Sequence, residues 1–148
     1  MTISRKVLCV AYGLIGLLAL IGCWGNNVQY LNLDLGILGV NAHFWGETLV
    51  NPASRSITID ILFLSLSAII WMLLEARRLA MRGVWIYILL GVFVAISAAF
   101  PAFMIHRERA LARRDASVSA GSLSAGDVLG VAILGLCMLA YMFIALGR

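Results

Sequence analysis

The stretch Ile57–Leu74, with the sequence ITIDILFLSLSAIIWMLL, decides the fold class of this chain. Its 18 residues include one charged side chain, Asp60. A helix needs about 20 mostly apolar residues to cross the hydrocarbon core of a bilayer. Because hydrocarbon offers no hydrogen-bond partner to the backbone, an open chain can cross it only as a helix. We therefore expect this stretch to be a transmembrane helix.

Three further stretches have the same character and carry no charge: Val7–Trp24, Val84–Phe103 and Val128–Leu146. The composition agrees, since 63% of the 148 residues are hydrophobic and only 12% are charged. A soluble domain has about 25% charged residues, and one of this size could not bury so much apolar surface. The sequence thus excludes a soluble enzyme, a nucleic-acid reader and a disordered tail. It predicts an all-α, polytopic membrane protein with four transmembrane helices.

The expected organisation has three parts: a three-helix membrane core over 1–109, a flexible Ala/Ser/Gly/Arg-rich linker over 110–125, and a fourth helix over 126–148. Asn51-Pro52 is typical of an N-cap followed by proline at the first helical position, so the second helix should run from Pro52 to about Arg78. Ser124 and Asp127 predict a capping box for the fourth helix. We also expect a short interfacial helix within Asn41–Leu49.

Small residues recur at four-residue spacing, at Gly91, Ala95 and Ala99 in the third span and at Gly126 and Gly130 in the fourth. Such stripes let helices approach closely in lipid. We therefore expect membrane lipids as partners, together with a protein partner or a second copy of the chain. No nucleic-acid partner is expected.

The orientation in the membrane is poorly specified by charge. With the N-terminus inside, four spans place six basic residues inside and five outside, which is almost no bias for the positive-inside rule. We expect a cell-membrane protein with a cytoplasmic N-terminus, because Arg5 and Lys6 flank the first helix to be inserted. The run Leu20–Cys23 also has the form of a lipoprotein signal, so lipidation at Cys23 is an alternative to a retained first helix.

Asp60 is the leading candidate for a functional residue, because a charge inside a span is costly. Helical periodicity places Asp60, Leu64, Ser67 and Trp71 on one face, which we expect to point into the bundle. The helix break at Pro101 would free the carbonyl of Ser97, so that Asp60 and Ser97 form a polar pocket. The candidate binding residues are Asn51, Asp60, Ser67, Trp71, Glu75 and Ser97. The alternative is that Asp60 only fixes the packing of its helix.

A second constellation consists of His43, Glu47, Asp60 and His106, which could converge near one leaflet and bind a metal or act as acid and base. Its spacing matches no metal-ligand motif, and the sequence carries no phosphate-binding loop or nucleotide fingerprint. We therefore expect no metal and no cofactor.

Glu75 and Arg78 are three residues apart, which favours an interfacial ion pair. Trp85 and Tyr87 are typical of an aromatic belt.

An ordered set of residues resembles an uncharacterised bacterial membrane family, known as domain of unknown function 2834. The set is Phe44-Trp45, Asn51-Pro52-x-Ser54, Asp60, Glu75-x-Arg-Arg78, Trp85-x-Tyr87, Phe100-Pro101-x-Phe103 and Arg107. The likeness covers about Val7 to Leu111 and implies a three-helix core, with no activity attached. The linker and the fourth helix are additions to that pattern.

These observations leave three hypotheses for function. The first is a non-catalytic accessory or assembly component that contacts lipid or partner helices. The second is an intramembrane enzyme or binder of a lipid-like molecule such as an isoprenoid, with Asp60 as proton donor. The third is a small transporter subunit, although four helices without a repeat leave little room for a pathway. Whether the protein is an enzyme is left open.

Overall fold

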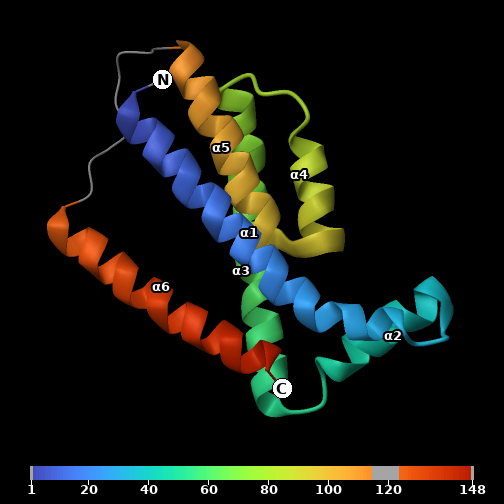
Figure 1. Cartoon of the computed structure of the whole chain (residues 1–148). Coiled ribbons are helices and arrows are strands. Elements are labelled where there is room, and N and C mark those ends of the chain that lie inside the picture. The colour runs from blue at the N-terminus through green and yellow to red at the C-terminus, as the bar shows by residue number, and fades with distance from the viewer. Residues whose placement is uncertain (1, 115–123, 148) are drawn as a thin grey trace. The chain divides into compact units, whose positions relative to one another are not determined.

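The computed structural model describes residues 2–114 and 124–147, which form helices and turns and, within these ranges, no strand (Figure 1). The helical segments are α1 (Ile3–Leu31), α2 (Gly36–Glu47), α3 (Pro52–Arg78), α4 (Val84–Leu90), the π-helical η1 (Gly91–Ala95), α5 (Ile96–Arg114) and α6 (Ala125–Leu146). Four stretches are long and apolar enough to cross a membrane: Ile3–Leu31, Pro52–Arg78, Val84–Arg114 and Ala125–Leu146. The expected all-α, multi-pass class is therefore confirmed.

The chain divides into two compact units. The first unit holds the residues up to Asn26 and those from Trp85 onward, and thus most of α1 together with α4, η1, α5 and α6. The second unit is Asn27–Val84, which includes α2 and α3. The first unit therefore joins the two ends of the sequence.

The expected helix starts agree closely with the structure. The Asn51 side chain accepts a hydrogen bond of 2.9 Å from the backbone N–H of Ser54, and α3 runs from Pro52 to Arg78 as predicted. Ser124 and Asp127 form the predicted capping box at the start of α6. Both caps satisfy backbone N–H groups that a helix start leaves without a partner.

Two boundaries differ from the prediction. The short helix expected at Asn41–Leu49 begins earlier, since α2 spans Gly36–Glu47. The linker expected at 110–125 begins later, because residues 110–114 continue α5. Those five residues are Ala, Leu, Ala, Arg and Arg, which all favour a helix. Of the rest of the expected linker, 115–123 lies outside the described residues, while Ser124 and Ala125 belong to the start of α6.

The third apolar stretch folds back on itself within Val84–Arg114. Tyr87 and His106 would be about 28 Å apart along a straight helix, yet Tyr87 Oη lies 3.1 Å from His106 Nδ1. The Tyr87 ring also meets the Phe103 ring edge-on, at a centroid distance of 5.8 Å. The short α4 and the longer α5 therefore run alongside each other in opposite directions, joined through η1 (Figure 1).

The two arms approach closely at position 91. A Cβ on Gly91 would lie 2.8 Å from Cδ1 of Ile96 and 3.7 Å from Cβ of Ala99, whereas residues eight apart on a straight helix are separated by about 12 Å. The small-residue stripe does mediate close packing, but between the two arms of one hairpin. Pro101, the expected site of the break, lies buried inside α5, and the chain turns at Gly91–Ala95 instead.

Within the first unit α1 is antiparallel to α5. Arg5 pairs with Glu108 at one end, and the Sγ atom of Cys23 lies 3.7 Å from the Ser97 Oγ toward the other end. Between them, a Cβ on Gly16 would lie 3.4 Å from the Ala98 carbonyl oxygen, so the two backbones approach closely.

The C-terminal end of α6 contacts α1 near the C-terminal end of α1. Met142 lies against Gly22, and Leu146 lies against Gly25. Because Arg5 and Gly25 are about 30 Å apart along the axis of α1, the C-terminal end of α6 and the paired end of α5 lie at opposite ends of α1. Among the described residues no neighbouring atom lies within 4 Å of a Cβ built on Gly130, and close packing at the start of the fourth helix stays a prediction.

Candidate functional site

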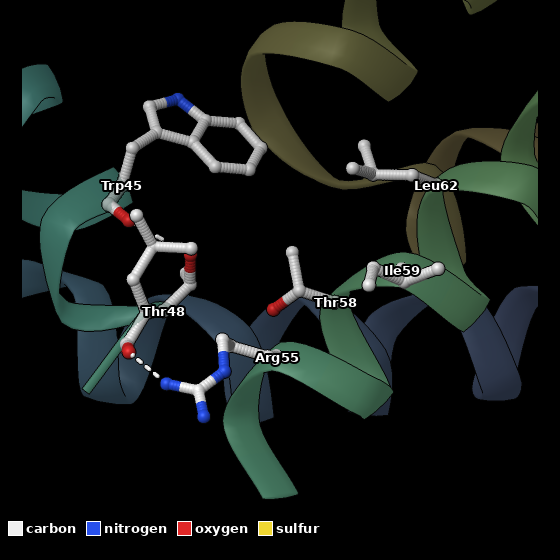
Figure 2. A pocket seen from close by; sticks show the side chains of 7 residues that line it. Trp45, Thr48, Arg55, Thr58, Ile59 and Leu62 are labelled. Carbon is white, nitrogen blue, oxygen red and sulfur yellow. Dashed lines mark hydrogen bonds between the residues drawn. The ribbon is translucent and has the colours of Figure 1, made fainter. Parts of the chain in front are cut away.

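A pocket in the second unit lies where α2 ends and α3 begins. It is lined by Trp45, Thr48, Leu49, Arg55, Thr58, Ile59 and Leu62 and has a volume of about 270 Å³. The chain reverses between the two helices at residues 48–51, and the Asn51 cap fixes the start of α3. Side chains one turn apart on α3 therefore face the last turn of α2 (Figure 2).

One charged side chain lies at the pocket. The Arg55 guanidinium donates a hydrogen bond of 2.8 Å to the Leu49 carbonyl oxygen, which holds the side chain across the turn. A guanidinium has five N–H donors, so this bond leaves others for a ligand. The Thr48 hydroxyl bonds the Trp45 carbonyl at 2.7 Å, so its own proton is already engaged.

The walls of the pocket are mostly hydrocarbon, supplied by the Trp45 indole and by Leu49, Ile59 and Leu62 (Figure 2). Its volume lies just below the range of about 300–1,000 Å³ typical of small-molecule sites. An apolar cleft with one cation at its edge suits part of an acyl or isoprenoid chain whose head group carries negative charge. Asp60 is not among the lining residues.

The first unit contains a buried ion pair that sequence reasoning missed. Arg5 Nη1 donates to Glu108 Oε2 at 2.6 Å, and the two side chains are only 6% and 3% exposed. Arg107 donates to the second oxygen of Glu108, at 2.7 Å. The carboxylate is thus held by two guanidinium groups, one from each of the two antiparallel helices.

Tyr87 and His106 form a second polar contact in this unit. Their hydrogen bond of 3.1 Å joins α4 to α5, and the ring centroids are 5.9 Å apart. Tyr87 was expected to belong to an aromatic belt and His106 to a cluster around Asp60. In the structure the pair joins the two arms of the hairpin, and the place of Tyr87 in an aromatic belt stays a prediction.

Asp60, Leu64, Ser67 and Trp71 lie on one side of α3, and the expected orientation of that side toward the bundle stays a prediction. Asp60, Leu64 and Ser67 are exposed, and Trp71 is 37% exposed. The buried side of α3 carries a different set of residues: Met72, Glu75 and Ala76. Of these three residues Glu75 is charged and only 7% exposed, so the buried side of α3 includes a polar side chain.

The other candidate residues have local partners. Ser67 bonds the Phe63 carbonyl within its own helix at 3.0 Å. Glu75 accepts two bonds of 2.6 Å from Arg78, which confirms the predicted ion pair. Ser97 lies beside Cys23, as described above. Asp60 and Ser97 belong to different units, and the pocket expected between them stays a prediction.

The expected acid–base constellation does not form a metal site. His43 and Glu47 share a face of α2, with 3.9 Å between Nε2 and Oε1, and both are about half exposed. Over the ranges 2–114 and 124–147, no three His, Cys, Asp or Glu side chains gather closely enough to hold a metal ion. The His43 ring instead stacks at a tilt on Tyr30, with centroids 5.9 Å apart.

A sequence signal for the buried ion pair was available. Glu108 is the only acidic residue in the basic run from Arg107 to Arg114, and an acid placed among cations beside an apolar span is a candidate for pairing. Its partner Arg5 could not be identified in this way, because 103 positions separate the two residues and the hairpin brings them together.

Among curated proteins and among solved structures, none matches this chain. The likeness inferred from the ordered polar and aromatic residues is confirmed, and it covers nearly the stretch expected. The family described as "Protein of unknown function DUF2834" matches residues 11–109, about two thirds of the sequence, and the chain therefore belongs to this family.

Proposed function

We propose that this small membrane protein is a non-catalytic accessory or assembly component that binds the transmembrane helix of a partner through the exposed face of α3. That face, termed here the Asp60 face, consists of Asp60, Leu64, Ser67 and Trp71. The observation that carries the proposal is the exposure of Asp60 on a helix long and apolar enough to cross a membrane.

The energetic argument starts from the position of Asp60. It lies eight residues after Pro52, about 12 Å along the axis of α3. A carboxylate at the centre of a membrane helix costs about 2.5–3.5 kcal/mol on insertion scales, and less toward either end. The short Asp side chain cannot reach back to the head groups as Lys or Arg can. A partner that covers Asp60 removes this cost.

The chemistry of the face defines the partner. A helix that brings a hydroxyl, amide or cationic donor to the Asp60 carboxyl satisfies it, and interhelical hydrogen bonds of this kind contribute about 1 kcal/mol in membranes. Leu64 and the Trp71 ring, about one and three turns beyond Asp60, supply exposed apolar contact area on the same face. The partner is therefore a membrane helix with one polar residue in an apolar surface.

Photocrosslinking in intact membranes tests this proposal. A photoreactive amino acid is placed at Leu64 and, as a matched control, at Leu66, which is 53% exposed but lies about 160° around the same helix from Leu64. We expect a discrete protein adduct from position 64 and lipid adducts alone from position 66. Asp60→Leu should abolish the protein adduct, while Asp60→Asn should retain part of it.

The mass of the adduct identifies the partner, and a product of twice the chain's own mass means a second copy. Lipid adducts alone at both positions would refute the proposal, as would a protein adduct that persists undiminished in Asp60→Leu. Helix content by circular dichroism shows that each variant is folded.

The pocket between α2 and α3 favours a second function, the binding of a lipid-like molecule. Its apolar walls and the Arg55 guanidinium suit an amphipathic ligand whose anionic group lies at the membrane surface. Extraction and mass spectrometry of lipids that co-purify with the protein provide the test. Leu62→Trp, which fills the pocket, should deplete a specific lipid, while Ile57→Trp, at a position that is 62% exposed and lies about 140° around α3 from Leu62, should not. Equal lipid content in both variants would exclude this function.

A further inference from the structure

We infer that α4, η1 and α5 form a re-entrant hairpin that enters and leaves the membrane on the side of the N-terminus, and that this side is a basic surface for anionic lipid head groups. The protein then crosses the membrane three times, through α1, α3 and α6. Its N- and C-termini lie on opposite sides. This inference is independent of the proposed function.

The hairpin arms are short enough to lie within half of a bilayer. The descending arm before the turn, Val84–Leu90, has 7 residues, and the apolar part of the ascending arm, Ile96–Ile105, has 10. At 1.5 Å per residue these arms are about 10 Å and 15 Å long, against a hydrocarbon core of about 30 Å. Tyr87 bonds His106 near the two open ends of the hairpin, so interfacial residues of both arms lie at one depth.

Contacts within the first unit relate the hairpin to both termini. The ion pair between Arg5 and Glu108 places the end of α5 beside the start of α1. Leu146 lies against Gly25, at the far end of α1. A straight third span would put Arg5 and Glu108 on opposite sides of the membrane, so the ion pair excludes it.

The hairpin changes the distribution of charge. Six basic residues lie at the paired ends of α1 and α5: Arg5, Lys6, Arg107, Arg109, Arg113 and Arg114. Three more precede the hairpin directly in the sequence: Arg77, Arg78 and Arg82. Only Arg55, at the start of α3, and Arg148, after α6, are left for the other side. The hairpin topology therefore places nine basic residues on the side of the N-terminus and two on the other side. Four straight spans would place six and five.

This asymmetry has two consequences. The positive-inside rule makes the side with nine basic residues cytoplasmic. The cytoplasmic leaflet carries anionic lipids, which attract clusters of Lys and Arg next to a membrane helix. The end of α5, with Arg113 and Arg114 exposed, is therefore a head-group contact.

Cysteine accessibility tests the topology. Cys9, Cys23 and Cys137 are replaced by Ala, and single cysteines are introduced by Ser4→Cys, Ala112→Cys and Gly147→Cys in the full chain. A membrane-impermeant maleimide is applied to intact spheroplasts and again after permeabilisation. We expect label from outside at position 147 only, with positions 4 and 112 reacting after permeabilisation.

Four straight spans predict a different pattern, with positions 4 and 147 on one side and position 112 on the other, and that result would overturn the hairpin. The reverse pattern, with 4 and 112 labelled from outside, would overturn the cytoplasmic assignment.

Native mass spectrometry in detergent with phosphatidylglycerol or phosphatidylcholine tests the head-group contact. Arg113→Gln/Arg114→Gln should lose a preference for phosphatidylglycerol that Arg55→Gln retains, and an equal preference in both variants would refute the contact.

Discussion

Replacing Glu108 by Gln should destabilise the protein more than any other loss of a single charge that leaves side-chain size unchanged. The substitution removes the carboxylate that accepts from Arg5 at 2.6 Å and from Arg107 at 2.7 Å, and it leaves the Arg5 guanidinium buried beside an amide. Both ends of the Arg5–Glu108 pair are almost inaccessible, with side-chain exposures of 6% and 3%.

The magnitude follows from that burial. Breaking a buried ion pair by removing one partner costs about 3–5 kcal/mol, while exposed pairs contribute about 0–1 kcal/mol. Because Gln keeps the size of the side chain and one acceptor, we expect the lower end, about 3 kcal/mol. That value corresponds to a change of about 150-fold in the unfolding equilibrium.

Reversible unfolding in mixed micelles with a rising fraction of SDS, followed by circular dichroism, measures the effect. Glu47→Gln is the matched control, because it makes the same chemical change in a half-exposed pair with His43. A double-mutant cycle with Arg5→Gln isolates the coupling between the two side chains, for which we expect about 1–3 kcal/mol. If Glu108→Gln costs no more than Glu47→Gln, or if the coupling is zero, the ion pair does not hold α1 to α5.

Three further predictions use the same unfolding assay. Gly91→Val places methyl groups against Ile96 at the hairpin turn and should lower the free energy of unfolding by about 1–3 kcal/mol. Its control, Gly130→Val, meets no described atom within 4 Å and should lower it by less than 1 kcal/mol. Equal losses in the two variants would refute the tight turn. Tyr87→Phe should lose about 1 kcal/mol with its bond to His106, and an unchanged midpoint would mean that the bond contributes nothing. Asn51→Ala should cost about 1 kcal/mol through loss of the N-cap, and no change would show that Pro52 alone sets the helix start.

Local signals in the sequence predicted the helices well. The N-cap at Asn51 and the capping box at Ser124 depend on side chains that bond backbone groups two or three residues away, so they need no tertiary information. The same holds for the pair of Glu75 and Arg78, one turn apart on α3.

The orientation of the candidate site could not be predicted from local signals in the same way. Helical periodicity correctly placed Asp60, Leu64 and Ser67 on one face, but the choice of which face turns inward depends on the shapes of the neighbouring surfaces. In lipid the apolar side of a helix gains nothing by turning away from the surroundings, so hydrophobicity does not decide the inner face as it does in water. The pocket at Arg55 likewise depends on the position of α2 over α3.

The sequence by itself determined that half of this chain is apolar helix long enough for a bilayer, because length and hydropathy are sums over neighbouring residues. It determined the family in the same way, through an ordered set of residues. Only the tertiary structure showed that the third apolar stretch reverses at Gly91 and that Arg5 meets Glu108. An apolar run has the same length and hydropathy whether it crosses the membrane once or turns back within it. The two cases differ in contacts between residues far apart in the chain.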